Sequence, residues 1–132
     1  MKKYILDTNV FLRFILNDIP AQVKKAEDLF QKARNGKIEI IIPQIVIFEI
    51  QFVLYKYYEL SKADTTLKIK AILSVEYFMI EAKDIFLKAI DYWVHNNISF
   101  PDSFLISFAE NYQADLISFD QKMNKLKNEI KS

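Results

Sequence analysis

The stretch that decides the fold is Tyr4-Ile5-Leu6-Asp7-Thr8-Asn9, a short apolar run that ends at an acid. Such a run predicts a buried β-strand, and Asp7 then stands at the carboxyl end of that strand. The pattern recurs late in the chain, where Leu116-Ile117-Ser118-Phe119 is followed by Asp120. In folds built on parallel strands, ligands bind beyond the carboxyl ends of the strands. Both acids are therefore candidate site residues.

The rest of the chain alternates between strand and helix patterns. Two further strands are expected, at Ile38 to Ile42 and at Tyr77 to Ile80. Helices are expected over residues 8–16, 21–34, 43–60, 83–96 and 101–111, with one more from Ser61 and a polar one from Gln121. This alternation predicts an α/β fold with a central parallel sheet of about four strands flanked by helices. With one glycine, three prolines and no visible linker, residues 1–132 are expected to form a single domain.

Composition excludes several kinds of site. The chain has no cysteine and one histidine, so disulfides, cysteine-bound zinc, iron–sulfur clusters, thiol nucleophiles and multi-histidine metal centres are ruled out. Its 18 basic and 17 acidic residues give a net charge of +1, which argues against coating nucleic acid by bulk charge. No signal peptide or membrane span is visible, and we expect a cytoplasmic protein.

Most of the other acids, among them Glu81 and Glu110, are expected on polar helix faces. Two more acids do not fit that pattern. Asp102 opens a helix, and its face continues through apolar residues, so its carboxylate should point inward. The helical neighbours of Glu49 are apolar, which places Glu49 on the buried side of its helix. A buried carboxylate without a partner costs several kcal/mol, on the order of 3–5, so something must compensate it.

Each of these acids also has an ordinary explanation. Asp7 and Asp120 could cap helices, and Asp102 could be a first-turn acid. Glu49 could be a core glutamate that pairs with Arg13 or with a backbone donor. Taken together, four inward carboxylates would repel one another, and a divalent cation would remove that repulsion. Oxygen ligands without histidine or cysteine favour Mg²⁺ or Mn²⁺. Such a site suits phosphoryl chemistry, because the ion activates water and neutralises phosphate charge.

The residues around these acids resemble a known family, the PIN-domain ribonucleases of the VapC toxin type. The resemblance is carried by Tyr4-Ile5-Leu6-Asp7-Thr8-Asn9-Val10-Phe11-Leu12-Arg13-Phe14, by Pro43 to Tyr58 with Glu49 inside it, by Pro101-Asp102-Ser103-Phe104-Leu105-Ile106 and by Ala114-Asp115-Leu116-Ile117-Ser118-Phe119-Asp120. It spans nearly the whole chain, and the order and spacing of the acids match.

The resemblance implies a Mg²⁺- or Mn²⁺-dependent endoribonuclease toxin that is inhibited by a cognate antitoxin and forms a homodimer. Asp7, Glu49, Asp102 and Asp120 would form the acidic catalytic and metal site. Thr8, Asn9 and Ser118 would be supporting polar residues, Ser118 standing where a threonine is more usual. Many relatives have a further strand after the last helix, which the lysine-rich residues 123–132 do not favour here.

Two other functions are alternatives for this sequence. A haloacid-dehalogenase-type phosphatase would use Asp7 as nucleophile and needs a carboxylate two residues later, where this chain has Asn9. A catalytically silent PIN-like binding or scaffold domain would have lost site acids, whereas all four are present.

Aromatic and basic residues offer candidate interaction surfaces. Phe52, Tyr55, Tyr57 and Tyr58 surround more of their helix than one core face can hide, which indicates either an antitoxin or dimer interface or a tyrosine rim. The lysines that could guide RNA phosphates are Lys2, Lys3, Lys24, Lys25 and Lys122, the alternative being a charge-balanced surface.

Overall fold

The computed structural model describes residues 1–131 and consists of two compact units, Met1–Glu81 (unit 1) and the chain from Ala82 onward (unit 2). The elements of unit 1 are β1 (Lys2–Ile5), α1 (Thr8–Leu16), α2 (Pro20–Arg34), β2 (Ile38–Ile42), α3 (Gln44–Phe52), a π-helical turn η1 (Val53–Tyr57), α4 (Lys62–Leu73) and β3 (Phe78–Ile80). Unit 2 contains α5 (Lys83–His95), α6 (Phe100–Asn111) and α7 (Gln121–Lys131). The single domain over residues 1–132 stays a prediction.

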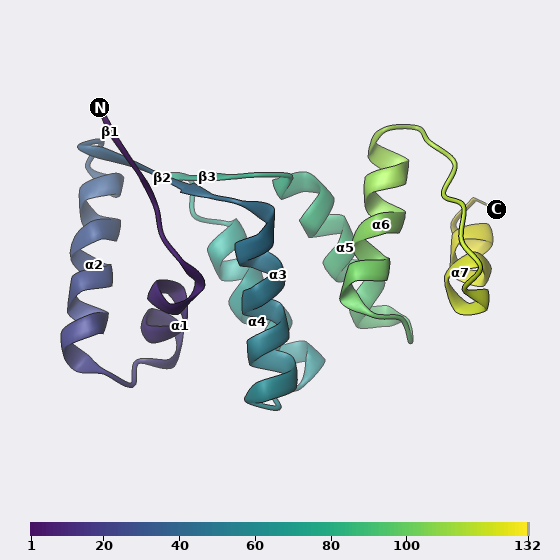
Figure 1. The fold of residues 1–132 in the computed structure, drawn as a ribbon, viewed down its shortest axis with the longest axis horizontal. Coiled ribbons are helices and arrows are strands. Elements are labelled where there is room, and N and C mark those ends of the chain that lie inside the picture. Colours follow the sequence, from purple (N-terminus) through teal and green to yellow (C-terminus); the bar gives the residue numbers. More distant parts are fainter. Residues whose placement is uncertain (132) are drawn as a thin grey trace. The chain divides into compact units, whose positions relative to one another are not determined.

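The three strands of unit 1 form one parallel sheet in the order β1-β2-β3 (Figure 1). The register pairs Lys2 with Ile38 on one side of β2, and Ile40 with Phe78 on the other. Parallel strands need long crossovers, which are provided here by α1 with α2 and by α3 with α4. The predicted α/β class with a parallel sheet and flanking helices is confirmed.

The core of unit 1 is built around the central strand. Ile38, Ile40 and Ile42 of β2 are buried, the last two completely. Phe11 of α1 is 1% exposed and stacks on Phe30 of α2, with ring centroids 5.9 Å apart. The β-branched run of β2 and the apolar faces of the two helices therefore bury one another, as the periodicity predicts.

The first strand is less buried than the sequence predicts. Tyr4 of β1 is half-buried and Ile5 is 66% exposed, whereas a buried strand was expected. The physical reason is its position, because β1 lies at the edge of the sheet and pairs only with β2 among the described residues. An apolar run cannot by itself distinguish a central strand from an edge strand.

The helix expected over residues 43–60 ends in a π-helical turn. The backbone N–H of Tyr58 donates to the carbonyl of Val53 at 2.9 Å, which is an i to i−5 bond. Glu59 then takes a positive φ of 55°, and Ser61 caps α4 by accepting from the backbone N–H of Asp64 at 3.0 Å. The cap predicted at Ser61 is confirmed.

No strand forms at residues 116–119, where one was expected. The carbonyls of this segment accept hydrogen bonds from side chains of α7 instead. Lys127 Nζ donates to the carbonyl of Leu116 at 2.6 Å, and Asn124 Nδ2 donates to that of Ser118 at 2.8 Å. Within residues 1–131 the sheet thus has three strands, and the predicted polar helix from Gln121 is present as α7. No helix in the described part of the chain is long and apolar enough to cross a membrane.

The buried aromatic cluster of unit 1 predicts a large effect of truncation. Phe11→Ala should lower the free energy of unfolding by about 3–5 kcal/mol, because it leaves a cavity between α1, α2 and the sheet. Phe14→Ala is the matched control, since Phe14 also touches Phe30 but is 44% exposed, and its loss should be much smaller. Urea denaturation measures both; equal losses would contradict this description of the core.

Candidate functional site

Asp7 lies between β1 and α1 and is exposed. It is the N-cap of α1, and its Oδ1 accepts from the backbone N–H of Val10 at 3.4 Å. The helix cap considered for Asp7 is therefore present. A cap of this kind uses one carboxylate oxygen, so the second oxygen remains available to a ligand.

Thr8 connects the end of β1 to α3. Its side chain is buried, at 7% exposed, and its hydroxyl donates to Glu49 Oε2 at 2.9 Å. This hydrogen bond spans 41 residues of sequence and ties the Asp7-Thr8-Asn9 motif to the middle of α3. Through this bond Thr8 orients the Glu49 carboxylate, which is a contact of the kind expected of a supporting residue.

Glu49 itself is exposed, and its prediction as a buried acid is wrong. Ile45 and Phe52 on the same face are 61% and 60% exposed, while Val46, Ile47 and Ile50 form the buried face of α3. Because α3 is apolar on nearly every side, its sequence cannot show which face meets the core. Arg13, the alternative partner for Glu49, pairs instead with Asp18 at 3.2 Å.

Another acid of unit 1, Glu81, lies at the carboxyl edge of the sheet. Its backbone N–H donates to the carbonyl of Ile42 at 3.0 Å, just beyond β3. Its Oε1 accepts from the backbone N–H of Gln44 at 3.0 Å, satisfying a donor in the first turn of α3. Sequence reasoning placed Glu81 on a solvated helix face and missed this role; its position directly after Phe78–Ile80 was the available signal.

In unit 2, Asp102 lies in the first turn of α6 and is half-buried. Ser99 caps the helix, since its Oγ accepts from the backbone N–H of Asp102 at 3.2 Å. Ile106, one turn further on, is buried, whereas Leu105 is 45% exposed. The inward direction predicted for Asp102 is thus met in part, and the helix N-terminus favours its ionised form.

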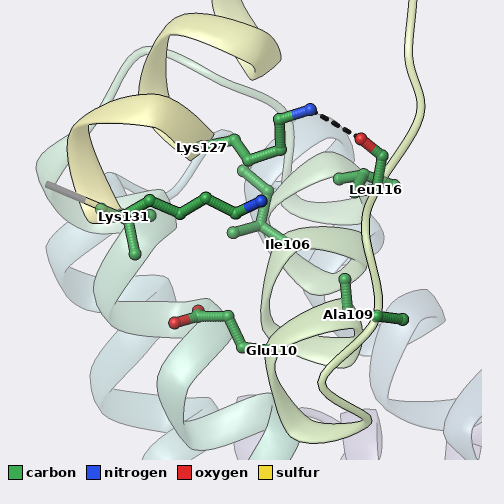
Figure 2. A pocket seen from close by; sticks show the side chains of 8 residues that line it. Ile106, Ala109, Glu110, Leu116, Lys127 and Lys131 are labelled. Carbon is green, nitrogen blue, oxygen red and sulfur yellow. Dashed lines mark hydrogen bonds between the residues drawn. The ribbon is translucent and has the colours of Figure 1, made fainter.

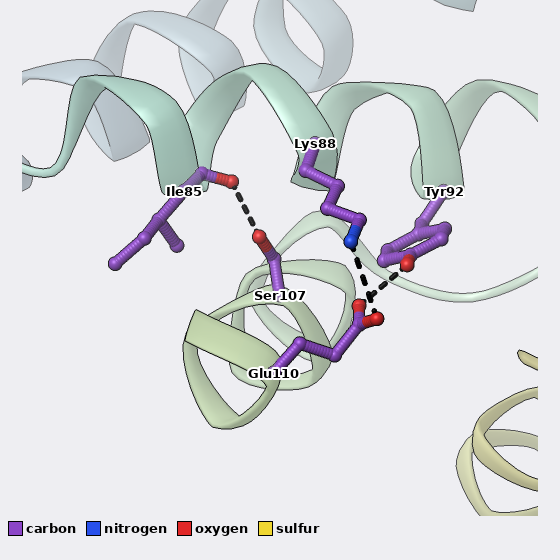
Figure 3. A network of polar contacts seen from close by, with 5 residues as sticks. All are labelled: Ile85, Lys88, Tyr92, Ser107 and Glu110. Atoms are coloured by element: carbon purple, nitrogen blue, oxygen red, sulfur yellow. Dashed lines mark hydrogen bonds and ion pairs between the residues drawn. The ribbon is translucent and has the colours of Figure 1, made fainter. Parts of the chain in front are cut away.

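Three polar contacts hold α6 against α5 (Figure 3). Ser107 Oγ donates to the carbonyl of Ile85 at 2.8 Å, and Tyr92 OH donates to Glu110 Oε1 at 2.5 Å. Lys88 Nζ lies 3.3 Å from Glu110 Oε2. Burial and the hydrogen bond to Glu110 raise the pKa of Tyr92 above its ordinary value. Glu110 therefore belongs to a helix–helix clamp, which corrects its placement on a solvated face.

Asp120 caps α7 and is exposed. Its Oδ1 accepts from the backbone N–H of Met123 at 2.8 Å, so the helix cap weighed for this residue is present. Ser118 Oγ accepts from the backbone N–H of Asp120 at 3.0 Å. Ser118 thus contacts the backbone of the acid that it was expected to support.

A pocket between α6, residues 114–116 and α7 lies beside this segment (Figure 2). It is lined by Ile106, Ala109, Glu110, Ala114, Leu116, Lys127, Ile130 and Lys131. Lys127 is bonded to the carbonyl of Leu116, and Lys131 Nζ lies 3.3 Å from Asp115 Oδ1. These two lysine contacts hold the segment that leads to Asp120 against α7.

The four predicted acids are divided between the units, Asp7 and Glu49 in unit 1 and Asp102 and Asp120 in unit 2. Across residues 1–131, no group of three or more acidic or histidine side chains could hold a metal ion. None of the four carboxylates pairs with a lysine or arginine of the described chain, whereas Asp18 and Asp28 do. Carboxylate oxygens that no basic residue neutralises are of the kind that Mg²⁺ and Mn²⁺ accept.

Comparison with known proteins adds one finding. The chain matches the PIN domain family over residues 4–129, nearly its whole length. The curated proteins and the solved structures contain no match. PIN domains are generally nucleases that use divalent metal ions.

The Thr8–Glu49 hydrogen bond predicts an energetic coupling between the two side chains. In EDTA, Thr8→Val should lower the free energy of unfolding by about 1 kcal/mol, while Thr8→Ser should lose less because the hydroxyl remains. In a Glu49→Ala background, Thr8→Val should cost little, because the hydroxyl has already lost its acceptor and valine has nearly the same shape as threonine. Chemical denaturation of the single and double variants gives the coupling energy, and a value near zero would contradict the contact.

The raised pKa of Tyr92 predicts a loss of stability at alkaline pH. The unfolded chain releases this proton near pH 10.0, whereas the folded chain holds it to higher pH. The contribution of the Tyr92 proton to the free energy of unfolding is therefore complete below pH 10.0, and it is lost as the pH rises through the higher pKa of the folded protein. Tyr92→Phe should show a shallower alkaline decline in the free energy of unfolding, with Glu110→Gln in between; identical pH profiles for wild type and Tyr92→Phe would contradict this.

Proposed function

The chain belongs to the PIN domain family, and from this premise we propose that it is a metal-dependent endoribonuclease toxin of the VapC type. The family match over residues 4–129 carries the proposal, because it covers all four acids in order. The hydrogen bond between Thr8 and Glu49 supports it, since it joins two motifs that are 41 residues apart. We propose further that residues 1–132 act as one PIN domain.

In this proposal the four carboxylates work together. Asp7, Asp102 and either Glu49 or Asp120 would hold Mg²⁺ or Mn²⁺, and the remaining acid would position a second ion or the attacking water. The donor set fits a hard ion, because it contains only carboxylate oxygens and none of them is neutralised by a basic residue of the described chain. When bound, the ion supplies water activation and charge neutralisation at the phosphate.

The side chains around the acids keep them oriented. Thr8 holds Glu49 through its hydroxyl, and the caps of α1 and α7 hold one oxygen each of Asp7 and Asp120. The water that these acids orient attacks phosphorus, the bond from phosphorus to the 3′ oxygen breaks, and the 3′ oxygen takes up a proton. The products are a 5′-phosphate and a 3′-hydroxyl, and no protein nucleophile is needed.

We propose a cognate antitoxin and a second copy of the chain as protein partners, and the cytoplasm as the place of action. The exposed side chains of α3 and η1 support an interface, because Phe52 and Tyr57 are 60% and 75% exposed. Leu54 between them is completely buried, so the two faces of η1 differ. Exposed aromatic side chains grouped on one helix are typical of binding surfaces.

Cleavage of RNA by the purified chain tests the enzyme. The wild type should cut total cellular RNA in Mn²⁺ or Mg²⁺ and not in EDTA, leaving 5′-phosphate ends. Asp102→Asn should lose at least about 100-fold in rate, because one carboxylate of the ion's ligand set is gone. Asp84→Asn is a matched control, since Asp84 is the first-turn aspartate of α5 and should cut like wild type.

Thermal melting with the same variants separates metal binding from cleavage. Millimolar Mn²⁺ should raise the melting temperature of wild type and Asp84→Asn by mass action, and should raise that of Asp102→Asn less. Equal cutting by all three proteins would refute the site. A wild type that neither cuts RNA nor responds to metal would favour a silent PIN-like binding domain.

A further inference from the structure

A groove runs between α1 and α2 of unit 1. It is lined by Asn9, Val10, Arg13, Gln22, Lys25, Ala26 and Leu29. Ala26 is buried and Val10 and Leu29 are half-buried, so the groove has an apolar floor. Asn9 lies in the first turn of α1, two residues after the N-cap Asp7, so one end of the groove lies near the start of that helix.

The polar groups around this floor are mostly unused within the protein. The side-chain amides of Asn9 and Gln22 and the ammonium of Lys25 have no hydrogen-bond or ion-pair partner among residues 1–131. The adjacent Lys24 differs, because its Nζ lies 3.8 Å from Asp28 Oδ1. Two amides and one cation thus remain available to a ligand on a single face.

Arg13 forms one wall of the groove and is held in place. Its Nη1 lies 3.2 Å from Asp18 Oδ2, and its side chain is 20% exposed. Its Nε is buried and has no hydrogen-bond partner within the described residues. Because Asp18 neutralises the guanidinium, Lys25 supplies the unbalanced positive charge of the groove.

We propose that the α1–α2 groove binds one nucleotide of the RNA strand beside the scissile phosphate, an inference that rests on the proposed ribonuclease function. The apolar floor contacts the base, the amides of Asn9 and Gln22 bond to its edge, and Lys25 pairs with the adjoining phosphate. Arg13 lies six residues after Asp7, about 9 Å along the helix axis, so a strand held at Asp7 reaches the groove with its next nucleotides.

Binding of a labelled single-stranded oligoribonucleotide in EDTA tests the groove without the chemistry. Lys25→Ala should weaken binding several-fold and lower the slope of log K against log salt by about 0.7, as expected for one lost phosphate contact. Lys32→Ala, which removes another lysine of α2 that does not line the groove, should bind like wild type. Gln22→Ala should change the preference among oligomers of different base composition, whereas Gln31→Ala on the same helix should not.

Cleavage kinetics separate this proposal from the proposed function. Lys25→Ala should raise KM with little change in kcat, because the contact is made equally in the ground and transition states. Equal binding and KM for Lys25→Ala and Lys32→Ala would overturn the groove while leaving the nuclease intact. A wild type that binds RNA through Lys25 but never cuts it would refute the nuclease and support the groove. Absence of RNA binding by the wild type would overturn both.

Discussion

Burial of the central strand β2 is the constraint on which the rest of unit 1 depends. A parallel strand has neighbours on both sides and helices over its faces, so its side chains are mostly apolar. Ile38, Ile40 and Ile42 are buried on one face of β2, whereas Glu39 and Ile41 on the other face are half-buried. The helices α1 and α2 carry the chain from β1 to β2 over the sheet. The parallel direction also brings every carboxyl strand end to one edge, which is why Asp7 and Glu81 lie at that edge.

Helix capping positions the acids in both units. Asp7 and Asp120 each use one oxygen to satisfy a backbone N–H of the helix that they begin, and Ser99 does the same for the helix that carries Asp102. The helix N-terminus also favours negative charge, so these carboxylates are stabilised where they stand. A cap therefore does not compete with ligand binding here; it fixes the backbone and leaves the second oxygen free.

The two units fix their helices by different means. In unit 1, aromatic packing between Phe11 and Phe30 joins α1 to α2. The side chain of Glu81, just beyond β3, accepts a hydrogen bond from the backbone N–H of Gln44 in the first turn of α3. In unit 2, a network of Tyr92, Lys88 and Glu110 joins α5 to α6. Burial and then the hydrogen bond to Glu110 raise the pKa of Tyr92 in this network.

The sequence by itself determined the local elements and the candidate acids. The helix at residues 8–16 and the strand at 38–42 follow from an N-cap, a run of β-branched residues and the breakers beside them, which act within a few residues. Asp7 and Asp102 were marked by a strand end and a helix start, which are local signals. Glu49 and Asp120 rested on an expected burial and an expected strand that the structure does not have. Only the tertiary structure decided which face of α3 is exposed, that residues 116–119 give their carbonyls to α7, and that Glu110 clamps two helices. These outcomes depend on contacts with residues far along the chain. The sequence pattern of an apolar helix or of a short apolar run does not indicate which segment it will contact.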